Sequence, residues 1–287
     1  MSPIALALLI VAAALHTGWN LLVKRAVNKQ LFTWWSMAVG AICFAPLLAL
    51  SPALPARIWP YIAVSALVEA IYYIALTRAY NLGDFSLVYP MARGAAPAFL
   101  ALWAALFLGE HPQLGGMLGL ALLLVGLTVV GLAAWRARRG AAAPGGGGML
   151  AALAVACCIS IYSAIDGAAM RSVNGISVPY TVAVIGLSAV FVTPVVLLSY
   201  GPGLIVTEWR TNWTRIILVG ALSLIAYGLV LQAYAIGRVS YAGAIREISV
   251  VFAALVGWRW LGEGFGAVRT LGALMIFAGI LVIALVG

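Results

Sequence analysis

The chain has 287 residues, of which 65% are hydrophobic and 8% are charged, and its mean hydropathy is +1.13. A soluble domain needs a surface that is roughly a quarter to a third charged, so this composition excludes a soluble protein and predicts an integral membrane protein. The net charge of +9 does not indicate a nucleic-acid partner, because the basic residues stand singly or in short groups between apolar runs, as topology signals do.

Ten apolar runs are long enough to cross a bilayer. A span needs about 20 mostly apolar residues, and each should be an α-helix because backbone polar groups in lipid must be satisfied within the segment. We therefore expect an all-α integral membrane protein of ten transmembrane helices, with both termini on the same side. The predicted spans are 3–23, 31–50, 58–77, 86–108, 113–135, 149–169, 177–200, 215–236, 241–261 and 265–286.

In the first span, His16, Trp19 and Asn20 lie at i, i+3 and i+4, so they share one face of the helix. In the sixth span, Tyr162 and Asp166 repeat that spacing. Ionisable side chains inside a membrane usually face a cavity or a partner. These residues indicate a substrate or proton site, and the alternative is hydrogen bonding between helices.

The third span carries Glu69 and Tyr73, and Tyr227 occupies the position equivalent to Tyr73 in the eighth. Glu69 is a second carboxylate within a span, so it joins Asp166 as a candidate for binding an ammonium group or exchanging a proton. Tyrosine rings suit a cavity for amphipathic solutes, although many membrane tyrosines are interfacial anchors.

The fourth span contains Tyr89, Arg93 and two prolines, Pro90 and Pro97. Prolines remove backbone hydrogen bonds, so we expect an interruption of this helix, which is tolerated where it meets protein or a water-filled cavity. Arg93 lies about one turn beyond Tyr89, so both residues lie on one face.

The ninth span contains Arg246 and Glu247, and Arg246 is the repeat counterpart of Arg93. One arginine from each half would bind a substrate carboxylate bidentately. The alternative is that the arginines pair internally with Glu69, Asp166 or Glu247. Both interpretations hold if the substrate and an internal carboxylate compete for the same arginine.

The second half of the chain repeats the first. The Arg- and Gly-rich segment 136–148 is typical of a flexible linker, and it separates a first repeat, 1–135, from a second, 149–287. Each repeat has five spans, an odd number, so the second enters the membrane from the opposite side, as in many secondary transporters with a midplane site. The matching pairs are Ser86 with Ser240, Arg93 with Arg246, Glu110 with Glu263, Gly119 with Gly272, Gly126 with Gly279, His16 with Tyr162, Asn20 with Asp166, and Arg25 with Arg171.

Glu110 and Glu263 end paired Leu-Gly-Glu segments between the last two spans of each repeat. The glycine permits a turn, and a glutamate near the amino end of the next helix is favourable. We interpret both segments as structural.

These duplicated motifs, with paired Ala-Tyr-x-x-Gly segments and Gly-rich fifth and tenth spans, resemble the EamA family of the drug/metabolite transporter superfamily. The resemblance implies a bacterial inner-membrane carrier, usually an exporter of amino acids or related metabolites, with a cavity lined by spans 1, 3, 4, 6, 8 and 9. It also implies cytoplasmic termini. The basic residues point the other way, since three lie on the side of the termini and eleven on the other, which favours termini outside the cytoplasm.

We therefore predict a carrier that works by alternating access on a small-molecule substrate, with protons as a candidate coupling ion and a monomer sufficient for function. No cofactor, metal or nucleic acid is expected, and no enzyme motif is present in the sequence. The alternatives are uptake or export of another metabolite or drug-like solute, a channel, or a membrane-embedded enzyme. The predicted substrate-binding residues are His16, Trp19, Asn20, Glu69, Tyr73, Tyr89, Arg93, Tyr162, Asp166, Tyr227, Arg246 and Glu247.

Overall fold

The computed structural model describes residues 1–24, 26–82, 85–111, 113–136, 146–252, 255 and 267–286. All regular secondary structure in these ranges is helical, and six of the described segments are long and apolar enough to cross a membrane. The predicted all-helical membrane protein is therefore confirmed. The helices are α1 (Pro3–Lys24), α2 (Lys29–Phe44), α3 (Pro46–Leu50), the short 3₁₀ helix η1 (Ala56–Ile58), α4 (Trp59–Leu82), α5 (Phe85–Phe107), α6 (Leu114–Arg136), α7 (Gly146–Ser172), α8 (Ser177–Ser199), α9 (Pro202–Ile236), α10 (Val239–Arg246) and α12 (Ala267–Val286).

Three of the predicted spans differ most from the helices found. The predicted 31–50 divides into α2 and α3 at Pro46, because proline has no N–H to continue the hydrogen-bond ladder. The predicted 215–236 begins earlier, at Pro202, where proline occupies the first helical position that it favours. In the predicted 241–261, α10 ends at Arg246, Glu247 forms a turn, and helix resumes at Ile248.

The interruption predicted at Pro90 and Pro97 is not found. α5 is helical from Phe85 to Phe107 through both prolines. Membrane helices accommodate proline because neighbouring helices and local adjustments satisfy the freed backbone groups. The helix break next to the predicted arginines lies instead in the second half of the chain, at Glu247.

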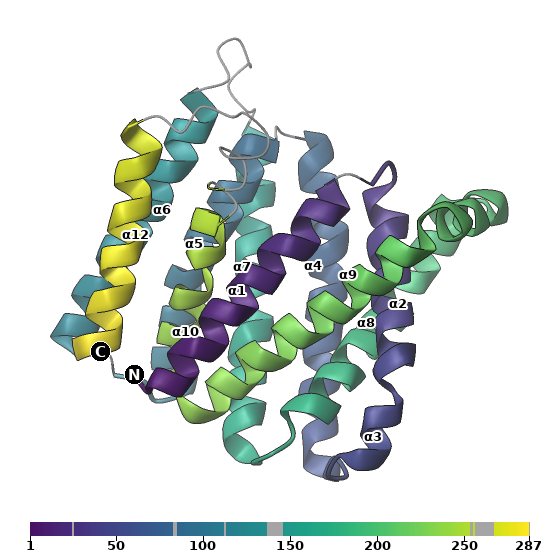
Figure 1. Cartoon of the computed structure of the whole chain (residues 1–287), viewed down its shortest axis with the longest axis horizontal. Coiled ribbons are helices and arrows are strands. Elements are labelled where there is room, and N and C mark those ends of the chain that lie inside the picture. The colour runs from purple at the N-terminus through teal and green to yellow at the C-terminus, as the bar shows by residue number, and fades with distance from the viewer. Residues whose placement is uncertain are drawn as a thin grey trace.

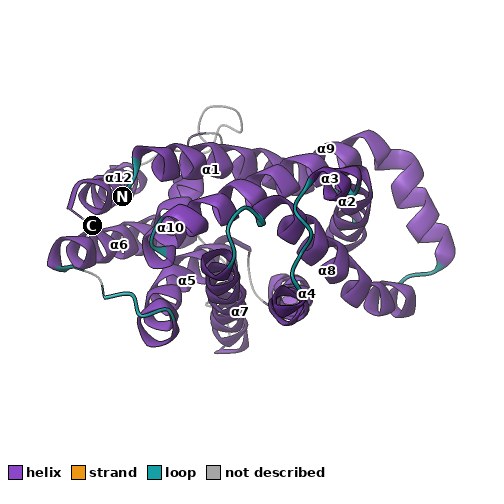
Figure 2. Cartoon of the chain, turned by 90° about the horizontal axis from the view of Figure 1, so that it is seen from below, coloured by secondary structure: helices purple, strands orange, loops and turns teal. Residues whose placement is uncertain are grey.

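The helices pack in corresponding pairs from the two halves of the chain. α1 packs along α9, and α4 packs along α7. α8 contacts both α2 and α4, while α6 and α12 form a pair at one side of the molecule (Figure 1). The two ends of the chain lie close together (Figure 2), and the Met1 amino group donates to the Ala284 carbonyl at 3.2 Å.

Glycines bring α6 and α12 into backbone contact. A Cβ atom at Gly119 would lie 2.9 Å from the carbonyl oxygen of Gly279, and one at Gly126 would lie 2.7 Å from that of Gly272. Real Cβ atoms do not approach backbone so closely, so both contacts require glycine. The two contacts exchange under the repeat correspondence, in which Gly119 matches Gly272 and Gly126 matches Gly279.

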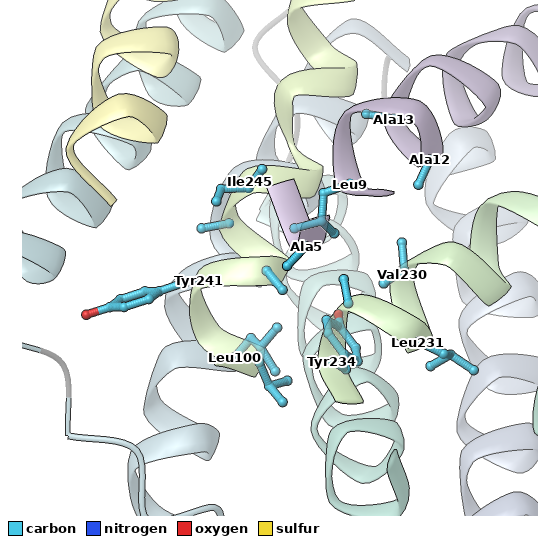
Figure 3. Packing of buried hydrophobic residues seen from close by; sticks show 14 of the residues in the cluster. Ala5, Leu9, Ala12, Ala13, Leu100, Val230, Leu231, Tyr234, Tyr241 and Ile245 are labelled. Carbon is cyan, nitrogen blue, oxygen red and sulfur yellow. The ribbon is translucent and has the colours of Figure 1, made fainter. Parts of the chain in front are cut away.

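A glycine also positions α10 against α5. A side chain at Gly243 would collide with Leu100, which lies beside α10 in Figure 3. Tyr241 points away from Leu100 in the same view, and its hydroxyl lies over Gly116 of α6. This close packing brings the residues that precede Leu100 on α5 near the carboxyl end of α10.

The loop between α5 and α6 caps α10. Gly109 has a φ of +62°, which glycine adopts without strain, and the turn places Glu110 against the other half of the chain. Its carboxylate accepts the backbone N–H of Val239 at 2.6 Å and of Ser240 at 3.1 Å, accepts the Ser240 hydroxyl, and pairs with Arg171 at the end of α7. The glutamate of the Leu-Gly-Glu segment is structural as predicted, but it caps α10 and not the next helix. Glu263 lies outside the described residues.

Glu110→Gln is expected to lower the free energy of unfolding by about 1–3 kcal/mol, because charge-assisted hydrogen bonds to a buried carboxylate are lost. Glu208→Gln is the matched control, since Glu208 is also buried but accepts from Asn212 of its own helix. The measurement is unfolding of purified protein in mixed micelles at increasing SDS. Equal effects of the two variants would contradict the capping role.

Candidate functional site

Asp166 of α7 is at the centre of a hydroxyl cluster made by three other helices. Its side chain has no exposed surface. The carboxylate accepts hydrogen bonds from Ser65 of α4 at 2.6 Å, from Tyr180 of α8 at 2.8 Å and from Tyr227 of α9 at 2.5 Å. We call these four residues the Asp166 cluster. A buried carboxylate that depends on hydroxyls can exchange them for an ammonium group or accept a proton.

Glu69 lies one turn beyond Ser65 on α4, so both face the same way. Its carboxylate accepts the Ser188 hydroxyl of α8 at 2.8 Å. Glu69 and Asp166 also interact electrostatically. The two carboxylates predicted as candidates for cation binding are therefore neighbours, each held by hydroxyl groups.

Arg93, Arg246 and Glu247 form a second buried group, which we call the arginine cluster. Arg93 Nε lies 2.9 Å from Glu247 Oε2, and Arg246 Nε lies 3.9 Å from Glu247 Oε1. Arg93 also donates to the Ser249 hydroxyl at 3.2 Å. Arg93 belongs to the first half of the chain, and Glu247 and Ser249 belong to the second, so the cluster joins the two halves.

Arg246 of the arginine cluster also interacts with the two carboxylates described above. This arginine interacts electrostatically with Asp166 and with Glu69, and its exposed fraction is 6%. Charges are costly in an apolar interior unless they are paired. An arrangement with guanidinium groups at one end and carboxylates at the other is complementary to a zwitterionic solute.

The three residues predicted to share one face of α1 have different contacts. His16 lies edge-on to Trp19, with ring centroids 4.8 Å apart, and interacts electrostatically with Arg93 and Arg246. Trp19 also packs on an apolar cluster that includes Phe32. The Asn20 amide donates to the His16 carbonyl of its own helix at 2.8 Å. This hydrogen bond is within α1 and does not involve Asp166, the repeat counterpart of Asn20.

Tyrosines surround the carboxylates. Tyr162 lies one turn before Asp166, and its ring centroid is 6.1 Å from that of Tyr72. Tyr72 in turn lies 5.0 Å from Tyr73, and Tyr73 packs in the same apolar cluster as Tyr227. The backbone of Tyr89 is in α5, but its side chain lies outside the described residues.

Sequence reasoning did not select Ser65, Tyr180, Ser188 or Ser249, all of which contact the predicted charged residues. Ser65 had a usable signal, because it precedes Glu69 by four residues and therefore shares its face. The others are single polar residues in apolar spans, and nothing in their local pattern distinguishes them.

Comparison with known proteins bears on the family and the fold. The model of the EamA-like transporter family matches residues 3–132 and 146–285. The uncharacterized transporter in cobO 3'region of a Sinorhizobium species is 34% identical over 73 residues, which cover 25% of this chain and 51% of that protein, so the match spans about half the relative's length. A crystal structure of a protein 18% identical in sequence has the same fold, with a TM-score of 0.72 over 99% of this chain and 98% of the other.

The family model matches two stretches of the chain, and together they extend over nearly all of the sequence. It confirms the resemblance that the duplicated motifs indicated, and identifies a membrane transporter in general terms. The chain belongs to the EamA-like transporter family.

Proposed function

We propose that this protein is a secondary carrier that moves small amphiphilic metabolites by alternating access, as an exporter of amino acids or related compounds. The observation that carries the proposal is the placement of buried opposite charges between the two halves of the chain. Arg93 of the first half pairs with Glu247 of the second, and Asp166 of the second half accepts from Ser65 of the first. A relative motion of the halves would therefore rearrange both groups.

The proposed architecture is ten transmembrane helices in two inverted five-helix repeats, 1–135 and 149–287, joined by 136–148. The corresponding packing of α1 on α9 and of α4 on α7 supports it. So do the reciprocal glycine contacts of α6 and α12, which exchange under the repeat correspondence. Inverted repeats of this type place the substrate site at their interface.

In this proposal the arginine cluster holds the anionic group of the substrate. Arginine suits this role because its guanidinium binds carboxylates bidentately. Asp166 and Glu69 hold an ammonium group or a coupling proton. The aromatic and polar residues around them contact the rest of the solute, namely His16, Trp19, Asn20, Tyr73, Tyr89, Tyr162 and Tyr227.

The proposed location is the bacterial inner membrane, with a monomer sufficient for transport. The contact between Met1 and Ala284 supports termini on the same side. The distribution of basic residues favours the outer side, whereas the family resemblance favours the cytoplasm. A cysteine added after Gly287 and tested with a membrane-impermeant thiol reagent in intact cells assigns the side, after the three native cysteines are replaced.

Counterflow in liposomes tests the proposal. Purified protein is expected to give saturable uptake of a labelled amino acid when the vesicles are preloaded with the same unlabelled solute, because a carrier exchanges substrate across one site. The panel should span acidic, basic, aromatic and aliphatic amino acids, with and without a pH gradient. Folded protein that moves none of them would contradict amino-acid transport, and a single-channel conductance without counterflow would indicate a channel.

A further inference from the structure

Glu247 is placed where its carboxylate meets both arginines. It follows the last residue of α10, and its backbone forms the turn before helix resumes at Ile248. None of its side chain is exposed. The turn, and the close packing that Gly243 permits against Leu100, direct Glu247 and Arg246 toward Arg93 on α5.

The carboxylate is shared unequally. Glu247 lies 2.9 Å from Arg93 Nε but 3.9 Å from Arg246 Nε, and Arg93 also donates to Ser249. Arg93 therefore has protein partners at 2.9 and 3.2 Å, whereas the ion-pair contact of Arg246 Nε with Glu247 is longer, at 3.9 Å. Counted without Asp166 and Glu69, which the proposed function assigns to the ammonium group or proton, two arginines and one glutamate leave the arginine cluster with a charge of 2 − 1 = +1.

The repeat explains why this charge is not zero. Both halves supply an arginine, but the residue after Arg93 is Gly94, whereas the residue after Arg246 is Glu247. A Cβ at Gly94 would meet Leu127 Cβ at 3.7 Å, an ordinary contact, so close packing does not exclude a side chain there. The arginines are duplicated, and the carboxylate belongs to the second half alone.

We propose that Glu247 determines the charge of the solute that the site accepts. By neutralising Arg93, it leaves one guanidinium for one substrate carboxylate, and it excludes solutes that bring two. The physical basis is that buried charges must be balanced by opposite charges in an interior of low dielectric constant. This inference rests on the proposed function, since it assigns the substrate class of the same site.

Glutamine and glutamate are suitable probes, because they have nearly the same shape and carry one and two carboxylates. The wild-type protein is expected to prefer glutamine in counterflow competition. Glu247→Gln raises the cluster charge to +2, and the preference should shift toward glutamate by about tenfold or more. Arg93→Met lowers the charge to zero, and competition by both solutes should weaken by about tenfold or more.

The double variant Arg93→Met with Glu247→Gln restores a charge of +1. It is expected to recover the wild-type preference for glutamine, although both altered residues have lost their charge. If Glu247→Gln does not fold, the comparison of Arg93→Met with the double variant still decides the question. A merely structural ion pair predicts no change of preference in any folded variant, and that result would overturn the inference.

A binding measurement separates this inference from the proposed function. Butyrate and succinate, which have four carbons each and one and two carboxylates, should shift the thermal unfolding midpoint of the purified protein differently. Stabilisation by succinate that appears in Glu247→Gln and is absent from the wild type supports the role of Glu247 even if no amino acid is transported. Equal effects of the two anions on both proteins would overturn it.

Discussion

Asp166→Asn is expected to reduce saturable counterflow about 100-fold or more while the protein remains folded. The substitution preserves the shape of the side chain but removes the charge that three hydroxyls share. Hydrogen bonds to charged groups contribute about 1.5–3 kcal/mol each, and about 2.7 kcal/mol corresponds to a 100-fold change in rate. The variant should stay folded, because a hydroxyl can rotate and accept a hydrogen bond from the new amide. The loss of counterflow would then come from the missing charge.

Two controls make this result specific. Tyr180→Phe removes one of the three donors and keeps the carboxylate, so it should cost about tenfold, which corresponds to the lower end of this range. Glu208→Gln also removes a buried carboxylate, but this carboxylate accepts its hydrogen bond from Asn212 of the same helix and is far from the Asp166 cluster in sequence. It should leave counterflow unchanged. Full transport by folded Asp166→Asn would remove Asp166 from the site and leave cation binding to Glu69.

Gly279→Ala is expected to lower the free energy of unfolding by about 3 kcal/mol, at the upper end of typical overpacking costs. The added Cβ would lie 2.6 Å from the Gly119 carbonyl oxygen and 2.8 Å from the Leu123 nitrogen. Backbone atoms cannot move aside as a flexible side chain can. α6 and α12 must separate, and the contact between Gly126 and Gly272 is then lost as well.

Gly18→Ala is the matched control, because a Cβ at Gly18 meets no atom within 4 Å. It should leave stability unchanged or raise it slightly, since alanine favours helix over glycine. The two variants are compared by the SDS midpoint of unfolding and by the yield of monodisperse protein. Equal stability of both would mean that the two helices separate readily at this contact.

The helices were predictable because lipid permits few other structures for a long apolar run. Their breaks were harder to predict. Pro46 interrupts the second predicted span, whereas Pro90 and Pro97 leave α5 helical, because the outcome depends on whether neighbouring helices compensate for the missing N–H. The turn at Glu247 has no proline at all.

The site was partly predictable from its charges. Ionisable residues inside spans are costly, so Glu69, Asp166, Arg93, Arg246 and Glu247 stood out before their contacts were known. The pairing of Arg93 with Glu247 joins residues 154 positions apart (247 − 93) and was one of several alternatives. Of the hydroxyls that hold the carboxylates, that of Tyr227 was predicted, whereas those of Ser65, Tyr180 and Ser188 were not, since serine and tyrosine are common in spans and carry no charge.

The capped helix α10 has a consequence for how the protein is made. Eight residues are too few for a helix that is stable by itself, and α10 ends at Arg246, directly before Glu247, two charges that lipid disfavours. The cap of α10, Glu110, its packing partner Leu100 and the ion-pair partner of Glu247, Arg93, all precede α10 in the chain. The ribosome therefore delivers these partners to the membrane before α10 itself emerges, and this short segment folds onto a first half that is already in place.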